Sequence, residues 1–140
     1  MSDEQFEKFY WPSLKQIFLE LIKAELTPLP FFEGDYDPRL KYLEELPKGK
    51  IIGHFDRTDV FKAKEIIGDV MCIKGNVPAS LLCTGTPRQV EEYCKKLIDI
   101  VGEGGGFIMD GAVNGIPDEA KPENVKAMTD FTKAYGVYRR

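Results

Sequence analysis

The sequence predicts an α/β fold of four parallel βα units, and two features of the chain support this prediction. Helical periodicity of apolar residues alternates with short, unbroken apolar runs along the whole length. Turns rich in glycine and proline separate these segments, and each unit is close to the ~30 residues that such a unit needs. With 140 residues, 43% of them hydrophobic, the chain is long enough for one domain over residues 1–140 with its own core.

The chain opens with a long helix that leads into the first strand. Residues 4–24 form the expected helix, and Pro12 is expected to break or restart it. Residues 27–32 form the first expected strand. The apolar residues spaced for one face of the helix are Leu14, Ile17, Phe18, Leu21 and Ile22.

The middle of the chain holds two short helices and two strands. Pro38 opens a helix that carries Leu40, Leu43 and Leu46, and residues 47–49 end it. The second strand is expected over residues 50–55, the next helix over residues 60–67 and the third strand over residues 70–74.

The last two helices have clear boundaries. Thr86, Pro87 and Gln89 form an N-cap, a first-turn proline and a reciprocal cap, so a helix begins there and runs to Val101. The glycines of residues 102–106 are interpreted as a turn, because they precede a strand and lack the spacing of a phosphate-binding loop. The fourth strand is expected over residues 107–110 and the final helix over residues 122–135.

Composition excludes several classes of protein. The net charge is −4 with both signs interspersed, so no basic stripe is present to bind nucleic acid. No apolar run approaches the ~20 residues of a membrane span, and the acidic start is unlike a signal peptide, so we expect a cytoplasmic protein.

The three cysteines fit neither a disulfide framework nor a structural zinc site, because their number is odd and their spacing matches no paired-ligand motif. We expect reduced thiols. Cys72 and Cys94 lie on apolar segments and are expected to be small buried residues, whereas Cys83 is expected in a loop.

Polar residues follow each predicted strand, at the edge of a parallel sheet where small-molecule sites form. Glu33 follows the paired phenylalanines of strand one, which predict partial burial suited to acid–base chemistry. His54 is the one histidine of the chain, and both a catalytic and a structural role fit it. The candidate catalytic residues are Glu33 and His54, and the candidate substrate-binding residues are Phe31, Asp56, Asn76, Asp110 and Asn114.

Two of the acidic residues have a simpler interpretation. Asp37 precedes the helix that opens at Pro38, and Asp59 precedes the helix of residues 60–67. Each is expected to cap its helix.

Six segments resemble the C-terminal half of uroporphyrinogen decarboxylase family proteins, and together they cover nearly the whole chain. The resemblance looks closer to the methyltransferase-like branch than to the decarboxylases. It implies that the four βα units are the C-terminal half of a (β/α)8 TIM barrel. The segments are Ile52-Gly-His-Phe-Asp56, Ala63-Lys-Glu-Ile-Ile-Gly-Asp69, Ile73-Lys-Gly-Asn-Val77, Thr84-Gly-Thr-Pro87, Gly105-Gly-Phe-Ile108 and Ile116-Pro-Asp-Glu-Ala-Lys-Pro-Glu-Asn-Val125.

The departures from the family bear on cofactors. The corrinoid methyltransferases resemble one another in a zinc site with a His-x-Cys-Gly segment after the fifth barrel strand and a Cys-Gly before the proline of the eighth. The matching positions here hold Phe31 to Gly34 and Asn114-Gly115, so the ligands are missing and no metal is expected. The decarboxylases resemble one another in an acidic residue before glycine after the fifth strand, and Glu33-Gly34 matches it. They also share a Gly-His-Gly stretch after the eighth strand, where Asn114 or its neighbours stand in place of the histidine. Asn76 matches the Gly-Asn of both branches.

The resemblance leaves two functional hypotheses open. In one, a zinc-free barrel acts on a small or tetrapyrrole-like substrate by decarboxylation, or by methyl transfer with a corrinoid as cofactor. In the other, the chain is a non-catalytic half-barrel or a split-enzyme subunit. Four parallel strands leave two edges and one face open, so we expect either a homodimer or an N-terminal half-barrel partner.

Overall fold

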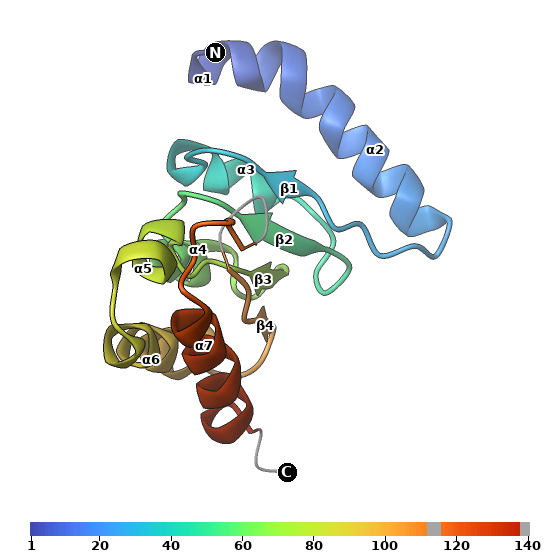
Figure 1. Ribbon diagram of the computed structural model, residues 1–140. Coiled ribbons are helices and arrows are strands. Elements are labelled where there is room, and N and C mark those ends of the chain that lie inside the picture. Colours follow the sequence, from blue (N-terminus) through green and yellow to red (C-terminus); the bar gives the residue numbers. More distant parts are fainter. Residues whose placement is uncertain (112–115, 138–140) are drawn as a thin grey trace.

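A parallel sheet forms the centre of the chain in the computed structural model, which describes residues 1–111 and 116–137 (Figure 1). The strands lie in chain order, β1-β2-β3-β4, and every neighbouring pair is parallel. This is the arrangement that repeated βα units predict. The strands are β1 (Phe31–Phe32), β2 (Ile52–Phe55), β3 (Cys72–Lys74) and β4 (Phe107–Ile108).

The four strands are shorter than the sequence predicts, and β1 shows the reason. Pro28 and Pro30 have no N–H to donate, so neither can complete a strand ladder. Their carbonyl groups still accept hydrogen bonds, from the N–H groups of Ile52 and His54 at 3.0 Å each. The predicted segment of residues 27–32 is therefore extended along β2, but only its last two residues count as strand.

The sheet buries one face and leaves the other open. Phe32 is paired with Phe55, and Ile73 is paired with Phe107. The side chains of Phe32, Phe55 and Ile73 are at most 2% exposed. The alternate residues point to the opposite face, where Phe31 and Ile108 are each 38% exposed. We call this second side the open face.

The helices between the strands cover the buried face (Figure 1). Asp59 caps α4, with its side chain accepting from the N–H groups of Phe61 and Lys62, and Thr86 and Gln89 form the predicted capping box of α6. The helices are η2 (Asp37–Arg39), α3 (Leu40–Leu43), α4 (Val60–Ile67), α5 (Ala79–Thr84), α6 (Pro87–Lys96), η3 (Leu97–Val101) and α7 (Pro122–Tyr135).

Helix α5 is absent from the sequence prediction, which placed a loop there. It has six residues and no side-chain cap, so no periodic pattern or capping signal marks it. Cys83 therefore lies on a helix, and its expected position in a loop was wrong. Helix α7 stabilises the end of α5, because the buried Asn124 amide donates to the carbonyl groups of Leu82 and Gly85 at 2.9 and 3.0 Å.

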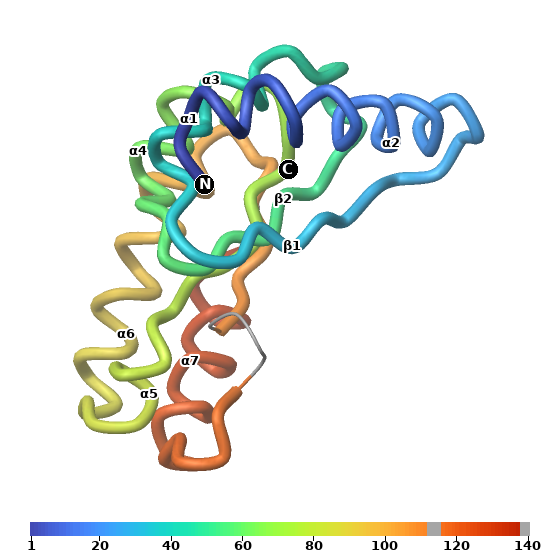
Figure 2. Tube along the Cα trace, turned by 90° about the horizontal axis from the view of Figure 1, so that it is seen from above, coloured from blue at the N-terminus to red at the C-terminus, as the bar shows by residue number. Residues whose placement is uncertain are grey.

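The N-terminal helix is continuous but changes its winding before Pro12. It consists of α1 (Asp3–Gln5), a π-helical turn η1 (Phe6–Tyr10) and α2 (Trp11–Lys23), so the helix restarts next to the proline as predicted. Trp11 and Phe18 are buried, and the ring of Phe18 meets that of Phe32 on β1 at 6.5 Å. Figure 2 shows the far end of α2 extending beyond the strands before the chain returns to β1.

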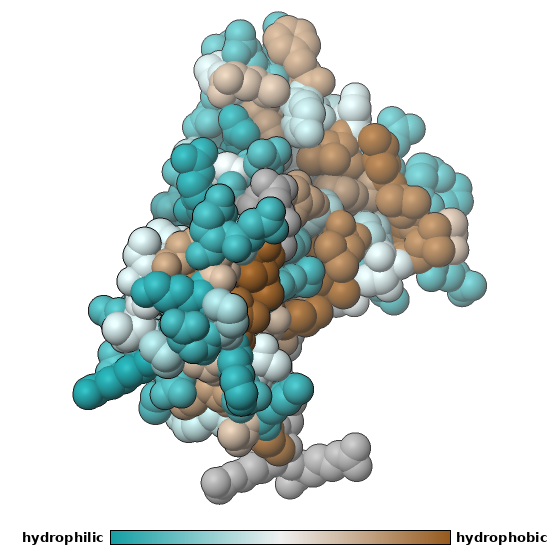
Figure 3. Space-filling view, viewed as in Figure 1, coloured by the Kyte–Doolittle hydropathy of each residue, from teal (hydrophilic) through white to brown (hydrophobic). Residues whose placement is uncertain are grey.

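Apolar side chains remain exposed next to the open face. Ile17 on α2 is 56% exposed, and Leu29 before β1 is 51% exposed. Figure 3 shows hydrophobic side chains gathered between α2 and the strands. Within the described ranges, no helix is long and apolar enough to cross a membrane.

Candidate functional site

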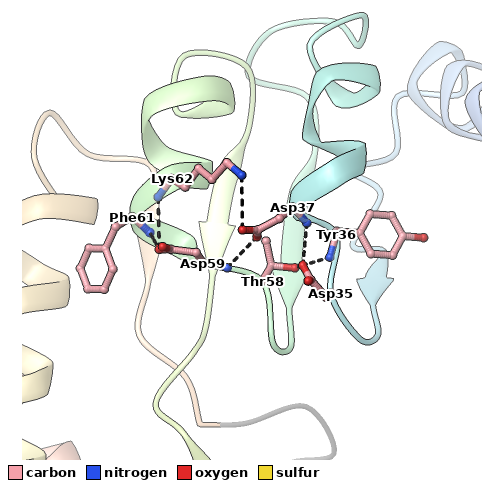
Figure 4. A network of polar contacts seen from close by, with 7 residues as sticks. All are labelled: Asp35, Tyr36, Asp37, Thr58, Asp59, Phe61 and Lys62. Carbon is pink, nitrogen blue, oxygen red and sulfur yellow. Dashed lines mark hydrogen bonds and ion pairs between the residues drawn. The ribbon is translucent and has the colours of Figure 1, made fainter. Parts of the chain in front are cut away.

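The loops after β1 and β2 are joined by hydrogen bonds from backbone groups to side chains (Figure 4). The N–H of Tyr36 donates to the buried hydroxyl of Thr58 at 2.9 Å, and the N–H of Asp59 donates to Asp37 Oδ1 at 2.9 Å. Lys62 Nζ lies 3.5 Å from Asp37 Oδ2. Asp37 makes no side-chain cap to its own helix, so the predicted capping role was wrong, and it joins the two loops instead.

Asp56 and Asn76 extend these connections towards β3. Asp56 Oδ2 accepts from the N–H of Gly34 at 2.9 Å. The side-chain nitrogen of Asn76 donates to the carbonyl groups of Asp56 and Thr58 at 2.7 and 2.9 Å. Both residues lie at strand ends as predicted, and both have a structural task there. Their proposed contact with substrate stays a prediction.

His54, Lys74 and Asp110 come together on the open face. His54 and Lys74 are register partners on β2 and β3, and Lys74 pairs in turn with Ile108, two residues before Asp110. Lys74 Nζ lies 2.5 Å from Asp110 Oδ2, and His54 Nε2 lies 3.9 Å from the same oxygen. The N–H of Gly111 fixes the other oxygen of Asp110 at 2.7 Å. We call these three residues the strand-end cluster.

His54 is the most enclosed member of the strand-end cluster. It is 8% exposed, and Phe31 meets its imidazole edge to face at 5.0 Å between ring centres. Burial lowers the pKa of His54 from its ordinary value, and the nearby Lys74 ammonium lowers it further, against the opposing effect of Asp110. The imidazole is therefore mainly neutral at pH 7.

Phe31 and Glu33 lie at the end of β1, and the structure separates their environments. Phe31 packs on His54, so it forms one wall of the strand-end cluster. Glu33 is exposed, so the partial burial predicted from its two preceding phenylalanines was wrong for this chain. Alternation along the strand explains the difference, because Phe32 points to the buried face and Glu33 lies past the strand end. Asn114 lies outside the described residues.

The structure also holds a cavity of about 580 Å³ between the loops that follow β2 and β3. It includes Asp56 and Asn76 but none of the strand-end cluster. We place the candidate site at the strand-end cluster, because charged groups converge there. The residues that line the cavity are Asp56, Arg57, Thr58, Asp59, Val60, Phe61, Asn76, Val77, Pro78, Ala79, Ser80 and Tyr93.

Metal ligands do not converge in the part of the chain that the structure describes. Within residues 1–111 and 116–137, no group of three or more His, Cys, Asp or Glu side chains is placed to hold a metal ion. Two of the three thiols are also poor ligands near neutral pH. Burial raises the pKa of Cys72, and it raises the pKa of Cys94 to about 11.

Lys74 is the member of the strand-end cluster that the sequence prediction missed. The sequence prediction places it in a strand and gives it no role. The sequence does contain a signal, because Lys74 is a charged residue at the end of an otherwise apolar strand, two positions before Asn76. Its proximity to Asp110 depends on the sheet register, which the sequence does not show.

Comparison with known proteins gives one consistent result. A family model described as uroporphyrinogen decarboxylase (URO-D) matches residues 1–135. A uroporphyrinogen decarboxylase of Chlorobium luteolum is 25% identical over 137 residues, which are 95% of this chain and 38% of that relative. One of Chlorobaculum tepidum is 24% identical over 138 residues, with the same two shares, 95% and 38%.

A third relative matches a shorter segment more closely. A uroporphyrinogen decarboxylase of Pseudoalteromonas atlantica is 31% identical over 79 residues, or 56% of this chain and 22% of the relative. The chain thus spans less than two fifths of the length of these relatives, 38% at most. All three are named decarboxylases, so the closer likeness to the methyltransferase-like branch stays a prediction.

Proposed function

The chain belongs to the uroporphyrinogen decarboxylase family, and from that membership we propose that it supplies one half of a (β/α)8 barrel that decarboxylates a small or tetrapyrrole-like substrate. The observation that supports this proposal most strongly is the strand-end cluster. Its residues meet at the carboxyl ends of parallel strands, where barrel enzymes carry their sites. They also face the open side of the sheet, which would be the interior of a closed barrel.

The chemistry of decarboxylation matches the groups present. The bond between the substrate carbon and its carboxylate breaks, CO2 leaves, and the electron pair stays on the carbon. A proton then replaces the lost carboxyl group, so no oxidant or reductant is needed. His54 and Glu33 are the candidate groups to hold and move that proton.

The direct test is an assay of the purified chain with uroporphyrinogen, the compound in the relatives' name. Reactions run without oxygen, and the products are separated by their number of carboxyl groups. We expect products with fewer carboxyl groups, and at least about a hundredfold slower formation with His54→Ala. Equal rates for both proteins, or no product from the chain under any pairing described below, would contradict the proposal.

Methyl transfer remains the second candidate, because the sequence resembles the methyltransferase-like branch. A corrinoid would then be the partner in the transfer, and the resemblance implies zinc to activate a thiol. The residues do not fit that metal site, since Phe31 and Glu33 occupy positions that hold ligands in the resembling enzymes. Demethylation of methylcobalamin by the chain, followed by absorbance, with no loss of CO2 from uroporphyrinogen, would favour this candidate.

The open face implies a partner. Two chains related by a two-fold axis would place β1 of each beside β4 of the other and close an eight-stranded barrel. An N-terminal half-barrel encoded by a separate gene would cover the same face. If no partner restores activity, the remaining hypothesis is a non-catalytic half-barrel.

Co-expression distinguishes these partners. The chain carries an affinity tag and is produced with a candidate N-terminal half from the same genome. Recovery of a one-to-one complex that decarboxylates uroporphyrinogen would favour the split enzyme, and recovery of the chain with an untagged copy of itself would favour the homodimer.

A further inference from the structure

Lys74 holds Asp110 close and thereby separates it from His54. The ammonium lies 2.5 Å from Asp110 Oδ2, whereas His54 Nε2 lies 3.9 Å from that oxygen, too far for a hydrogen bond. The second oxygen of Asp110 is held by the N–H of Gly111 at 2.7 Å. Both carboxylate oxygens therefore have a partner other than the imidazole.

The imidazole is enclosed but has a polar atom without a partner. His54 is 8% exposed, and among the described residues its Nε2 has no hydrogen-bond partner. The ring of Phe31 lies 5.0 Å from the imidazole in a T-shaped contact, and a Cβ added at Gly75 would lie 3.7 Å from His54 Cδ2. Buried polar atoms are rarely left unpaired, so Nε2 is placed to meet a group beyond the described residues.

The charged groups around the imidazole come from three segments. Burial and Lys74 on β3 oppose protonation of His54, while Asp110 after β4, the backbone of Gly111 and Asp56 after β2 favour it. Lys74 therefore acts in two ways, through its own charge and through its hold on Asp110. Both effects keep the imidazole neutral.

We propose that Lys74 is a positioning residue, which holds the Asp110 carboxylate away from His54 and so leaves the His54 Nε2 lone pair free for a hydrogen-bond donor of the substrate. A suitable donor is an N–H or O–H group next to the carboxylate to be lost. The identity of this donor as part of a substrate that loses a carboxylate rests on the proposed function. The arrangement itself is testable without any activity.

The test uses the fact that the chain has a single histidine. The Cε1–H signal of His54 is followed by NMR as the pH is changed, in the unmodified chain and in three variants. With Lys74→Met, we expect the pKa of His54 to rise by about one unit or more, because Asp110 becomes free to accept from Nε2 and the positive charge is gone. With Lys74→Arg, the ion pair persists and the titration stays close to that of the unmodified chain.

Asp110→Asn serves as the matched control. It removes the carboxylate that favours protonation, so the His54 signal should titrate at or below the pH of the unmodified chain. Combined with Lys74→Met, it should abolish most of the rise. Spectra with the dispersion of the unmodified chain confirm that each variant is folded, and a Lys74→Met variant that unfolds is replaced by Lys74→Gln.

The outcomes separate this inference from the proposed function. An identical His54 titration in the unmodified chain and in the folded Lys74 variants would overturn the inference. A raised pKa with no decarboxylation in any preparation would support the role of Lys74 and overturn the proposed function. In an active preparation, Lys74→Met should lower kcat more than it changes KM and move the acid limb of the pH profile upward, and Lys74→Arg should restore it.

Discussion

At the scale of single residues, the strand-end cluster combines a buried imidazole, His54, with an ion pair between Lys74 and Asp110. His54 and Asp110 lie at strand ends as predicted, and the sheet register brings them together on one face. Glu33 is exposed, although two phenylalanines precede it, because it lies beyond the end of β1. Lys74 was missed because its partner, Asp110, lies on another strand.

His54 also predicts how stability depends on pH. Its pKa in the folded chain lies below its ordinary value of 6.5, so the unfolded chain binds a proton that the folded chain does not. The stabilisation is complete above pH 6.5 and is lost as the pH falls towards the folded-state pKa. We expect the Tm to fall between roughly pH 7.5 and pH 5, and calorimetry would measure it.

The control for this prediction is His54→Gln, which removes the titrating group. Its Tm should change less over the same interval. The carboxyl group of Glu45 does not interfere, because its pKa is lowered from an ordinary value of 4.5 and so lies below the pH interval of this measurement. Equal slopes for the two proteins would contradict the buried, neutral imidazole.

At the scale of elements, the sequence predicted the order of helices and strands, and it missed α5 and the true lengths of the strands. Capping residues were reliable where they form a reciprocal pair, as with Thr86 and Gln89. Asp37 was misassigned, because a lone acidic residue before a proline has the same sequence signature whether it caps its own helix or accepts from a neighbouring loop. Tertiary contacts decide between these roles.

The hydrogen bond between the loops after β1 and β2 has a testable contribution. Thr58→Val keeps the shape of the side chain but leaves the buried N–H of Tyr36 without an acceptor. We expect a loss of about 1–3 kcal/mol in the free energy of unfolding and faster hydrogen exchange at the Tyr36 amide. Thr58→Ser keeps the hydroxyl and should preserve the protection. Unchanged exchange in Thr58→Val would show that this bond does not hold the loops together.

The contact between α7 and α5 gives a second prediction at this scale. Asn124→Ala removes the amide that donates to the carbonyl groups of Leu82 and Gly85, so unfolding should become easier by about 1–3 kcal/mol. Thr129→Ala, at an exposed position of the same helix, should change the stability by about 0.5 kcal/mol or less. Urea denaturation measures both, and similar values for the two variants would rule out a structural role for Asn124.

At the scale of the whole molecule, the proposed function requires a partner that covers the open face. The predicted apolar stripe of the first helix included both Phe18 and Ile17, but only Phe18 is buried within this chain, and Ile17 is 56% exposed. The stripe is therefore wider than the surface that the chain itself covers. Phe31 and Ile108 on the open face are exposed in the same way. Such surface is typical of an interface.

A substitution on α2 tests whether this surface holds a partner. Ile17→Glu should leave the fold intact, because the side chain is already exposed, and should weaken assembly by at least about tenfold in Kd. Ile100→Glu is the matched control, because Ile100 is also apolar and 43% exposed but lies on η3. Sedimentation over a range of concentrations would measure both variants. Equal weakening by the two variants would contradict a specific interface on α2.

The most direct measurement is the molar mass of the purified chain in solution by light scattering, combined with a thermal melt. One chain has a mass of 15.9 kDa. We predict a particle of twice that mass with a cooperative melt, in which two half-barrels cover each other's open faces. A particle of 15.9 kDa that melts cooperatively and binds no hydrophobic dye would contradict it, because the chain would then be stable with its open face uncovered.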